Sequence, residues 1–217
     1  NMGTLQVFKN VDLNGDGDYV DANETGATDW QWRANNGSWR NTGSAAVSVA
    51  TGNYALEEQG PNGFSFVSLT CQNGTLNTQT NTVAVTTGKN VVCTFYNKRD
   101  TATISFLKEV IGGSSPPSDW TFTISGNNGT AKSGDTKTYQ TGTYTVTESG
   151  PTGYTATGAS GACSMNELGV ISLLVTLQGG QCKVTNTRDT GSLTVNKALD
   201  DNGDGTFETS NPTNFNW

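Results

Sequence analysis

Two segments of the chain repeat a pattern in which an apolar strand face ends in a carboxylate. Residues 52–64 and 142–154 each alternate in the β manner and then stop at a Gly-Pro-x-Gly turn. Such alternation indicates a strand with one face turned to the core. The acids Glu58 and Glu148 share that inward face, where a carboxylate is costly unless a partner satisfies it. Each acid therefore requires a buried polar partner elsewhere in the chain.

The repetition extends along the whole sequence with a period of about ninety residues. An opening strand segment occurs three times, at residues 3–9, 102–108 and 191–197, and a closing segment occurs twice, at 93–101 and 182–190. We expect two complete units, residues 1–100 and 101–189, and the start of a third at 190–217. That third unit is interpreted as part of a longer tandem array, with completion by a neighbouring molecule as the alternative. Short Arg-Asp-Thr junctions favour a stiff rod.

Composition predicts an all-β fold. The chain is rich in Thr, Gly and Asn, only 14% of its 217 residues are charged, and Asn-Gly turn signals recur at short spacing. We expect each unit to form a small Ig-like β-sandwich of seven or so strands, with minimal helix. No apolar run approaches the roughly 20 residues of a membrane span.

Charge and residue content exclude several functions. The net charge is −7 and the chain has no histidine. An acidic chain without a basic patch is a poor binder of nucleic acid. The absence of histidine makes serine-triad and zinc-hydrolase chemistry very unfavourable.

Each unit places a lysine, a glutamate and an asparagine in the inward register of three separate strands. The two sets are Lys9, Glu58 and Asn97 in the first unit, and Lys108, Glu148 and Asn186 in the second. In order and register they resemble the Cna B-type, prealbumin-like modules that build the stalks of bacterial pilins and surface adhesins. The resemblance covers both full units and the opening of the third.

The resemblance implies isopeptide bonds from Lys9 to Asn97 and from Lys108 to Asn186, assisted by Glu58 and Glu148. Burial disfavours charge, so the amine becomes a better nucleophile and can attack the asparagine side-chain carbonyl while ammonia leaves. This is a single-turnover self-modification, and no enzyme is predicted. A buried Lys–Glu pair capped by Asn without a covalent bond is the alternative.

Four cysteines fall two to a unit, as Cys71 with Cys93 and Cys163 with Cys182. Their spacing, without Cys-x-x-Cys and without histidine, does not fit a zinc site. We expect one disulfide in each unit, which places the chain in an oxidising extracellular space. Free buried thiols are the alternative.

Two acidic loops predict Ca²⁺ sites, because oxygen side chains at alternate positions around glycines suit a hard cation. The candidate ligands are Asp12, Asn14, Asp16, Asp18, Asp21 and Glu24 in the first loop, and Asp200, Asn202, Asp204, Glu208 and Asn211 in the second. Similar loops occur in calcium-binding B-type repeats of adhesins. A solvated acidic turn is the alternative, and the second unit lacks such a loop.

Together these features predict an extracellular, cell-surface fibre or stalk that associates with further repeats or copies of itself. A module that binds a carbohydrate or a host protein is the alternative, distinguished by a unique exposed aromatic groove. Among the tryptophans, Trp39 alone has no counterpart in the other unit, and it is the candidate for exposure.

Overall fold

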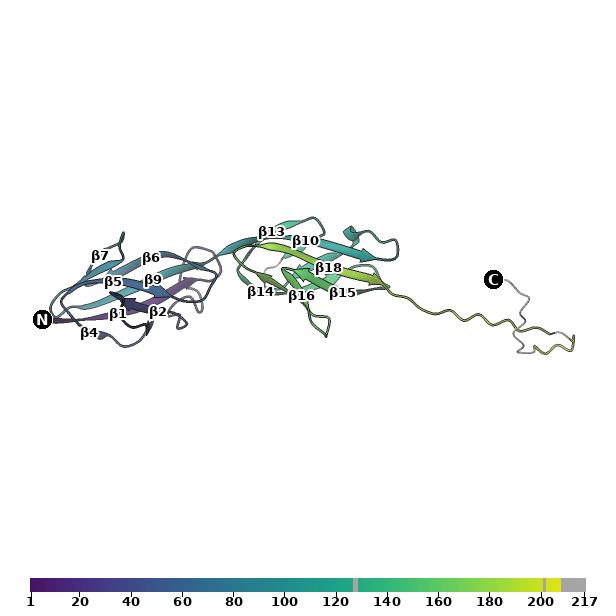
Figure 1. The fold of residues 1–217 in the computed structure, drawn as a ribbon, viewed down its shortest axis with the longest axis horizontal. Coiled ribbons are helices and arrows are strands. Elements are labelled where there is room, and N and C mark those ends of the chain that lie inside the picture. Colours follow the sequence, from purple (N-terminus) through teal and green to yellow (C-terminus); the bar gives the residue numbers. More distant parts are fainter. Residues whose placement is uncertain (127–128, 201, 208–217) are drawn as a thin grey trace.

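The computed structural model describes residues 1–126, 129–200 and 202–207. They form two β-sandwich units, called unit 1 and unit 2 below, which lie end to end as a rod (Figure 1). The prediction of an all-β chain of tandem sandwiches is confirmed. Within the described ranges the helical content is a single 3-10 turn, Pro117–Asp119.

Unit 1 contains nine strands in two sheets. The strands are β1 (Met2–Asp12), β2 (Gln31–Ala34), β3 (Arg40–Asn41), β4 (Val47–Ala50), β5 (Gly52–Gln59), β6 (Phe64–Gln72), β7 (Thr75–Asn77), β8 (Thr82–Val85) and β9 (Asn90–Arg99). One sheet has the order β4-β1-β9-β6 and the other has the order β3-β2-β5-β8-β7. The first and last strands are therefore neighbours in the same sheet.

Unit 2 repeats this arrangement. Its strands are β10 (Thr101–Ile111), β11 (Thr121–Ile124), β12 (Gly129–Ala131), β13 (Thr136–Gln140), β14 (Gly142–Ser149), β15 (Tyr154–Gly161), β16 (Cys163–Met165), β17 (Ile171–Val175) and β18 (Gly180–Arg188). The sheet orders are β13-β10-β18-β15 and β12-β11-β14-β17-β16. Again the first strand, β10, lies beside the last, β18.

The described part of each unit has more strands than the seven or so expected, because its turns allow very short extra hairpins. Asn35 and Asn36 lie in the turn between β2 and β3 with φ values of 48° and 57°, and Asn81 lies in the turn between β7 and β8 with a φ of 49°. Asparagine and glycine tolerate this left-handed conformation better than other residues. Short strands such as β3 and β7 are thereby added at the sheet edges.

The first and last strands of each unit run parallel, which is unusual in an otherwise antiparallel sandwich. Lys9 faces Phe95 across the β1–β9 ladder, and Lys108 faces Val184 across the β10–β18 ladder. Parallel pairing requires a long connection between the two strands, and here the connection is the rest of the unit. The chain enters each unit and leaves it along adjacent strands.

The alternating inward residues of both sheets form one core in each unit. In unit 1 this core includes Leu5, Val7, Trp32 and Phe95, all 3% exposed or less. In unit 2, Phe106 and Phe122 stack with their ring centroids 5.7 Å apart. These cores surround the polar sets predicted from the sequence.

No strand element follows β18 among the described residues, which continue through residue 207 except for position 201. The third unit at 190–217 therefore stays a prediction. Its candidate ligands Glu208 and Asn211 lie outside the described residues.

Candidate functional site

A buried ion pair joins the two sheets of unit 1. Lys9, on β1, has no exposed surface, and its Nζ donates to Oε2 of Glu58 at 2.7 Å. Glu58 comes from β5 in the opposite sheet, and 11% of its side chain is exposed. The carboxylate at the end of the inward face thus has the lysine as its partner.

Asn97 lies beside this pair on β9. It sits opposite Val11, one diagonal step from Lys9 on the same face of the parallel ladder. Its side chain is buried, and Oδ1 has no hydrogen-bond donor. A buried carbonyl oxygen without a donor costs roughly 1–3 kcal/mol. The amide is therefore an unsatisfied group next to an amine and a carboxylate.

Unit 2 holds the same arrangement. Nζ of Lys108 lies 2.6 Å from Oε1 of Glu148, an ion pair in which the two side chains are 0% and 9% exposed. Asn186 sits opposite Val110, again one diagonal step from the lysine, and its Oδ1 also lacks a donor. The structure thus brings all six residues of the predicted sets together as two triads.

A tryptophan and a glycine cover each lysine, which the sequence did not reveal. Nζ of Lys9 lies 3.9 Å from the ring centroid of Trp30, and a Cβ on Gly60 would lie 2.2 Å from that indole. In unit 2, Trp120 and Gly150 stand in the same places. The repeated Asp-Trp dipeptide and the first glycine of the repeated turn were the available signals.

Burial dominates the electrostatics of both lysines. Desolvation lowers the pKa of Lys9 to about 8, although the hydrogen bond and the charge of Glu58 oppose the shift. Burial likewise lowers the pKa of Lys108, against the opposing effect of Glu148. A lysine with a depressed pKa yields the neutral, nucleophilic amine more readily. Each triad therefore offers a nucleophile, a proton carrier and an amide carbonyl.

The structure contains both predicted disulfides. Cys71 and Cys93 face each other on β6 and β9, with an S–S distance of 2.09 Å, and Cys163 joins Cys182 on β18. No cysteine is free. Both disulfides tie the last strand of a unit, which also carries the asparagine.

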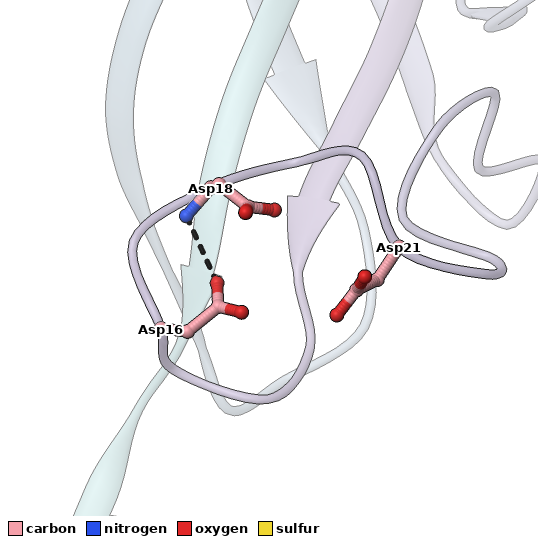
Figure 2. A group of neighbouring side chains, drawn as sticks. All are labelled: Asp16, Asp18 and Asp21. Carbon is pink, nitrogen blue, oxygen red and sulfur yellow. Dashed lines mark hydrogen bonds between the residues drawn. The ribbon is translucent and has the colours of Figure 1, made fainter.

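The first acidic loop follows β1. Figure 2 shows Asp16 and Asp18 on one side of the loop and Asp21 on the other, and each offers a carboxylate oxygen within 4.8 Å of the others. Burial raises the pKa of Asp21, and the charges of Asp16 and Asp18 raise it further. Asn14 donates its amide to Asp16 and Asp21 at 2.9 and 2.7 Å. The loop thus gathers oxygen ligands that repel one another.

The other two predicted ligands, Asp12 and Glu24, hold the backbone of this loop in place. Asp12 and Glu24 are buried, and both oxygens of each carboxylate accept backbone N–H groups. Asp12 accepts from Gly15 and Gly17, whose φ values of 81° and 91° favour glycine. These contacts preshape the turn.

The second acidic loop takes the same local turn. Asp200 accepts from the backbone of Gly203, Asp204 and Gly205, and Asn202 donates to Asp204 at 3.0 Å. Asp200, Asn202 and Asp204 therefore match Asp12, Asn14 and Asp16 in geometry as well as in sequence.

Trp39 is half-buried, with the Arg33 guanidinium 4.6 Å from its ring centroid. The cation covers one face of the ring. The expectation of an exposed Trp39 is therefore met only in part.

Two sandwiches in tandem, each with parallel terminal strands, a buried Lys–Glu–Asn triad and one disulfide, define the chain as a tandem β-sandwich protein. The chain belongs to the prealbumin-like fold domain family, whose sequence profile matches residues 1–95 and 100–187. The prealbumin-like resemblance is thereby confirmed. The family's description names a fold and no catalytic activity.

Several solved structures are similar to this chain at low identity. The TIE protein of Bacillus anthracis is 18% identical, with 86% of this chain and 34% of that chain covered and a TM-score of 0.46. A C-terminal fragment of the pilus adhesin SpaC from Lactobacillus rhamnosus GG is 14% identical, covering 90% of this chain and all of the fragment, with a TM-score of 0.42. The major pilin of Streptococcus pyogenes is 16% identical, covering 88% of this chain and all of that chain, with a TM-score of 0.33.

The chain spans about a third of the length of the TIE protein. No curated protein matches the sequence. In the described part of the chain, no helix is both long and apolar enough to cross a bilayer.

Proposed function

We propose that this chain is a segment of an extracellular stalk or filament, in which a Lys–Asn isopeptide bond locks each sandwich. One observation carries the proposal. In both units the lysine and the asparagine lie diagonally adjacent on the first and last strands, and the asparagine oxygen lacks a donor beside the Lys–Glu pair. A purely structural ion pair gives no reason for the repeated unsatisfied amide.

The bond would form in one balanced step sequence. The lysine transfers a proton to the glutamate, and the free amine attacks Cγ of the asparagine. The glutamic acid polarises the carbonyl and delivers its proton to the departing nitrogen, and the resulting glutamate takes the extra proton from the attacking lysine nitrogen. The C–N bond to Lys replaces the C–N bond of the amide, and ammonia leaves. Trp30 and Trp120 would exclude water and hold the amine over the carbonyl.

Such a bond would have a mechanical effect that follows from strand order. A pull along the rod loads β1 against β9, because the chain enters and leaves unit 1 on these neighbouring parallel strands. A covalent link from Lys9 to Asn97 carries that load past the rest of the sandwich. The same holds for Lys108 and Asn186 in unit 2. Each unit then resists unravelling.

The disulfides support an oxidising, extracellular location, since such bonds rarely persist in a reducing cytosol. We place the protein at the cell surface, where its partners are further repeats of the same kind. A ligand on a host or on another cell is not needed to explain either triad.

We further propose that the first acidic loop binds Ca²⁺. Its donors are all oxygens, and the mutual repulsion of Asp16, Asp18 and Asp21 gives a hard cation a reason to bind. Asp12 and Glu24 would hold the loop in shape around it. The role is structural, because the loop lies at the end of β1 and carries no triad residue.

Intact-mass measurement tests the isopeptide proposal. After allowance for two disulfides, two bonds remove two ammonia molecules, about 17 Da each. Peptide mapping should then join the segment with Lys9 to the segment with Asn97, and Lys108 to Asn186. A mass equal to that of the uncrosslinked sequence would sink the proposal.

A further inference from the structure

Four hydrogen bonds surround one turn at the joint between the two units. Asp100 donates its N–H to the carbonyl of Gly63 at 2.9 Å, and its side chain accepts from Ser65. Thr141 donates its N–H to the carbonyl of Asp100 at 2.8 Å, and its hydroxyl donates to the carbonyl of Gly63 at 2.9 Å. Gly63 closes the Gly-Pro-x-Gly turn of unit 1.

The end of a unit is here called its tail, and it consists of the Gly-Pro-x-Gly turn and the aspartate after the last strand. The two bonds that Asp100 makes with Gly63 and Ser65 lie within the tail of unit 1. Unit 2 has the same tail, since Asp189 donates to the Gly153 carbonyl at 3.0 Å and accepts from Thr155 at 2.7 Å. The tail is therefore built within each unit, without help from a neighbour.

The start of a unit is here called its head, and it consists of the threonine before β5 or β14 and the turn after β8 or β17. The third bond, from the N–H of Thr141 to the carbonyl of Asp100, has a counterpart at the head of unit 1. In unit 1, Thr51 donates its N–H to the carbonyl of Asn1 at 3.2 Å, as Thr141 does to Asp100. The remaining bond, from the Thr141 hydroxyl to the carbonyl of Gly63, is the one of the four that has no counterpart elsewhere among the described residues.

Burial follows this division. Thr141 is 8% exposed, whereas its counterpart Thr51 is exposed. Gly63 approaches so closely that an added Cβ would lie 2.6 Å from the Thr141 hydroxyl, whereas the nearest atom to a Cβ on Gly153 is 3.6 Å away. Thr141 is thus buried by its contact with the tail of unit 1.

Apolar residues mark the same joint. One cleft between the units is lined by Phe66 of unit 1 and by Leu174 and Leu177 of unit 2. By strand register, the head of unit 1 has Ala84 and Thr87 where unit 2 has the two leucines. Likewise Ala156 replaces Phe66 in the tail of unit 2. The larger side chains occur on the head and the tail that meet.

We propose that the tail of unit 1 is a docking surface for the head of unit 2, and that the Thr141 hydroxyl fixes the two units in one orientation. The partner is the following unit of the same chain, recognised by the Thr141 hydroxyl, with Leu174 and Leu177, both more than half exposed, lining the cleft beside it. This deepens the stalk function proposed above by naming what stiffens the rod, and it does not require the isopeptide bonds.

Distance measurement between spin labels tests the proposal in the full chain. All four native cysteines are paired, so Ser48→Cys and Thr123→Cys, both at exposed positions, provide two free thiols for labelling. Wild type should give one narrow distance distribution. Thr141→Val keeps the shape of the side chain but removes the donor, and it should lose the narrow peak. Thr51→Val, the matched change at the head of unit 1, lies away from the joint between the two units and should keep it.

A glycine pair provides a second matched test. Gly63→Ala and Gly153→Ala place a Cβ at similar left-handed φ values of 87° and 77°, but only the first clashes with Thr141. The first alone should broaden the distribution. A broad wild type, a narrow Thr141→Val, or equal broadening by both members of either pair would overturn the proposal.

The same samples separate this proposal from the isopeptide proposal. Intact mass reports the crosslinks and the distance distribution reports the joint. A broad distance distribution in crosslinked wild-type protein would contradict the proposal about the joint and leave the isopeptide proposal intact. A narrow distribution without mass loss defeats the crosslink alone.

Discussion

Lys9 on β1 and Asn97 on β9 lie one diagonal step apart on the same face of two parallel strands, and Lys108 and Asn186 repeat this relationship. A bond between them would join the strands by which the chain enters and leaves each unit. The glutamate reaches the lysine from the opposite sheet. The proposed bond would therefore form between the same two strands that carry a pulling force through the unit.

Glu148→Ala should abolish the bond in unit 2 and leave the bond in unit 1. Without its carboxylate, Lys108 has no proton acceptor, and a buried unpaired charge destabilises unit 2 by roughly 3–5 kcal/mol. Intact mass should show the loss of one ammonia in place of two, with Lys9 still joined to Asn97. Retention of the Lys108–Asn186 peptide would remove Glu148 from the mechanism.

Bond formation in unit 1 should slow at alkaline pH. The proposed reaction needs one proton held by the Lys9–Glu58 pair. Burial lowers the pKa of Lys9 to about 8, so the pair loses this proton as the pH rises through 8. The rate should be level near neutral pH and fall about tenfold for each pH unit above 8. Refolding uncrosslinked chain over a pH series, with mass-spectrometric timing, measures this rate.

The opposite pH profile has a different meaning. A rate that rises steeply through pH 8 would show that loss of the amine proton to solvent is limiting. Glu58 would then not be the proton carrier.

Removing the disulfide of unit 2 should destabilise that unit alone. Cys163→Ala with Cys182→Ala opens a crosslink of sequence separation 19. The chain-entropy account gives a loss of roughly 3 kcal/mol in the free energy of unfolding. Calorimetry should show one transition lowered and the transition of unit 1 unmoved. Equal lowering of both would mean that the units unfold as one.

Ca²⁺ should stabilise unit 1 and not unit 2. At a concentration one hundred times the dissociation constant, a bound ligand adds about 2.7 kcal/mol to the folded state. The melting temperature of the unit 1 transition should rise with Ca²⁺ and return with a chelator. Asp16→Asn should remove most of this rise, whereas Asp204→Asn, its match in the second loop, should leave it intact. No rise in wild type would exclude the site.

Strand alternation was enough to predict which residues face inward. It placed Lys9, Glu58 and Asn97 on inward positions, and in the structure Lys9 and Asn97 are 3% exposed or less. The repeat then indicated that the inward position of Lys9 is not a coincidence, because Lys108 occupies the same position in unit 2. The fold class followed from the same alternation and from the frequency of turn residues.

Contacts between distant segments could not be predicted in this way. The parallel pairing of β1 with β9 depends on the whole sandwich, because alternation does not specify a strand's neighbour. Trp30 over Lys9, and Gly60 against that indole, result from a close approach between loop and strand. The Thr141–Gly63 contact joins two units, and no pattern within one unit encodes it.

Single-molecule stretching of the full chain from its two ends tests the central claim most directly. If both triads have reacted, neither unit should release the residues between its lysine and its asparagine at any force below covalent rupture. The Glu58→Ala, Glu148→Ala double variant should instead show two unfolding steps. Two such steps in the wild-type protein would contradict the locked-stalk account.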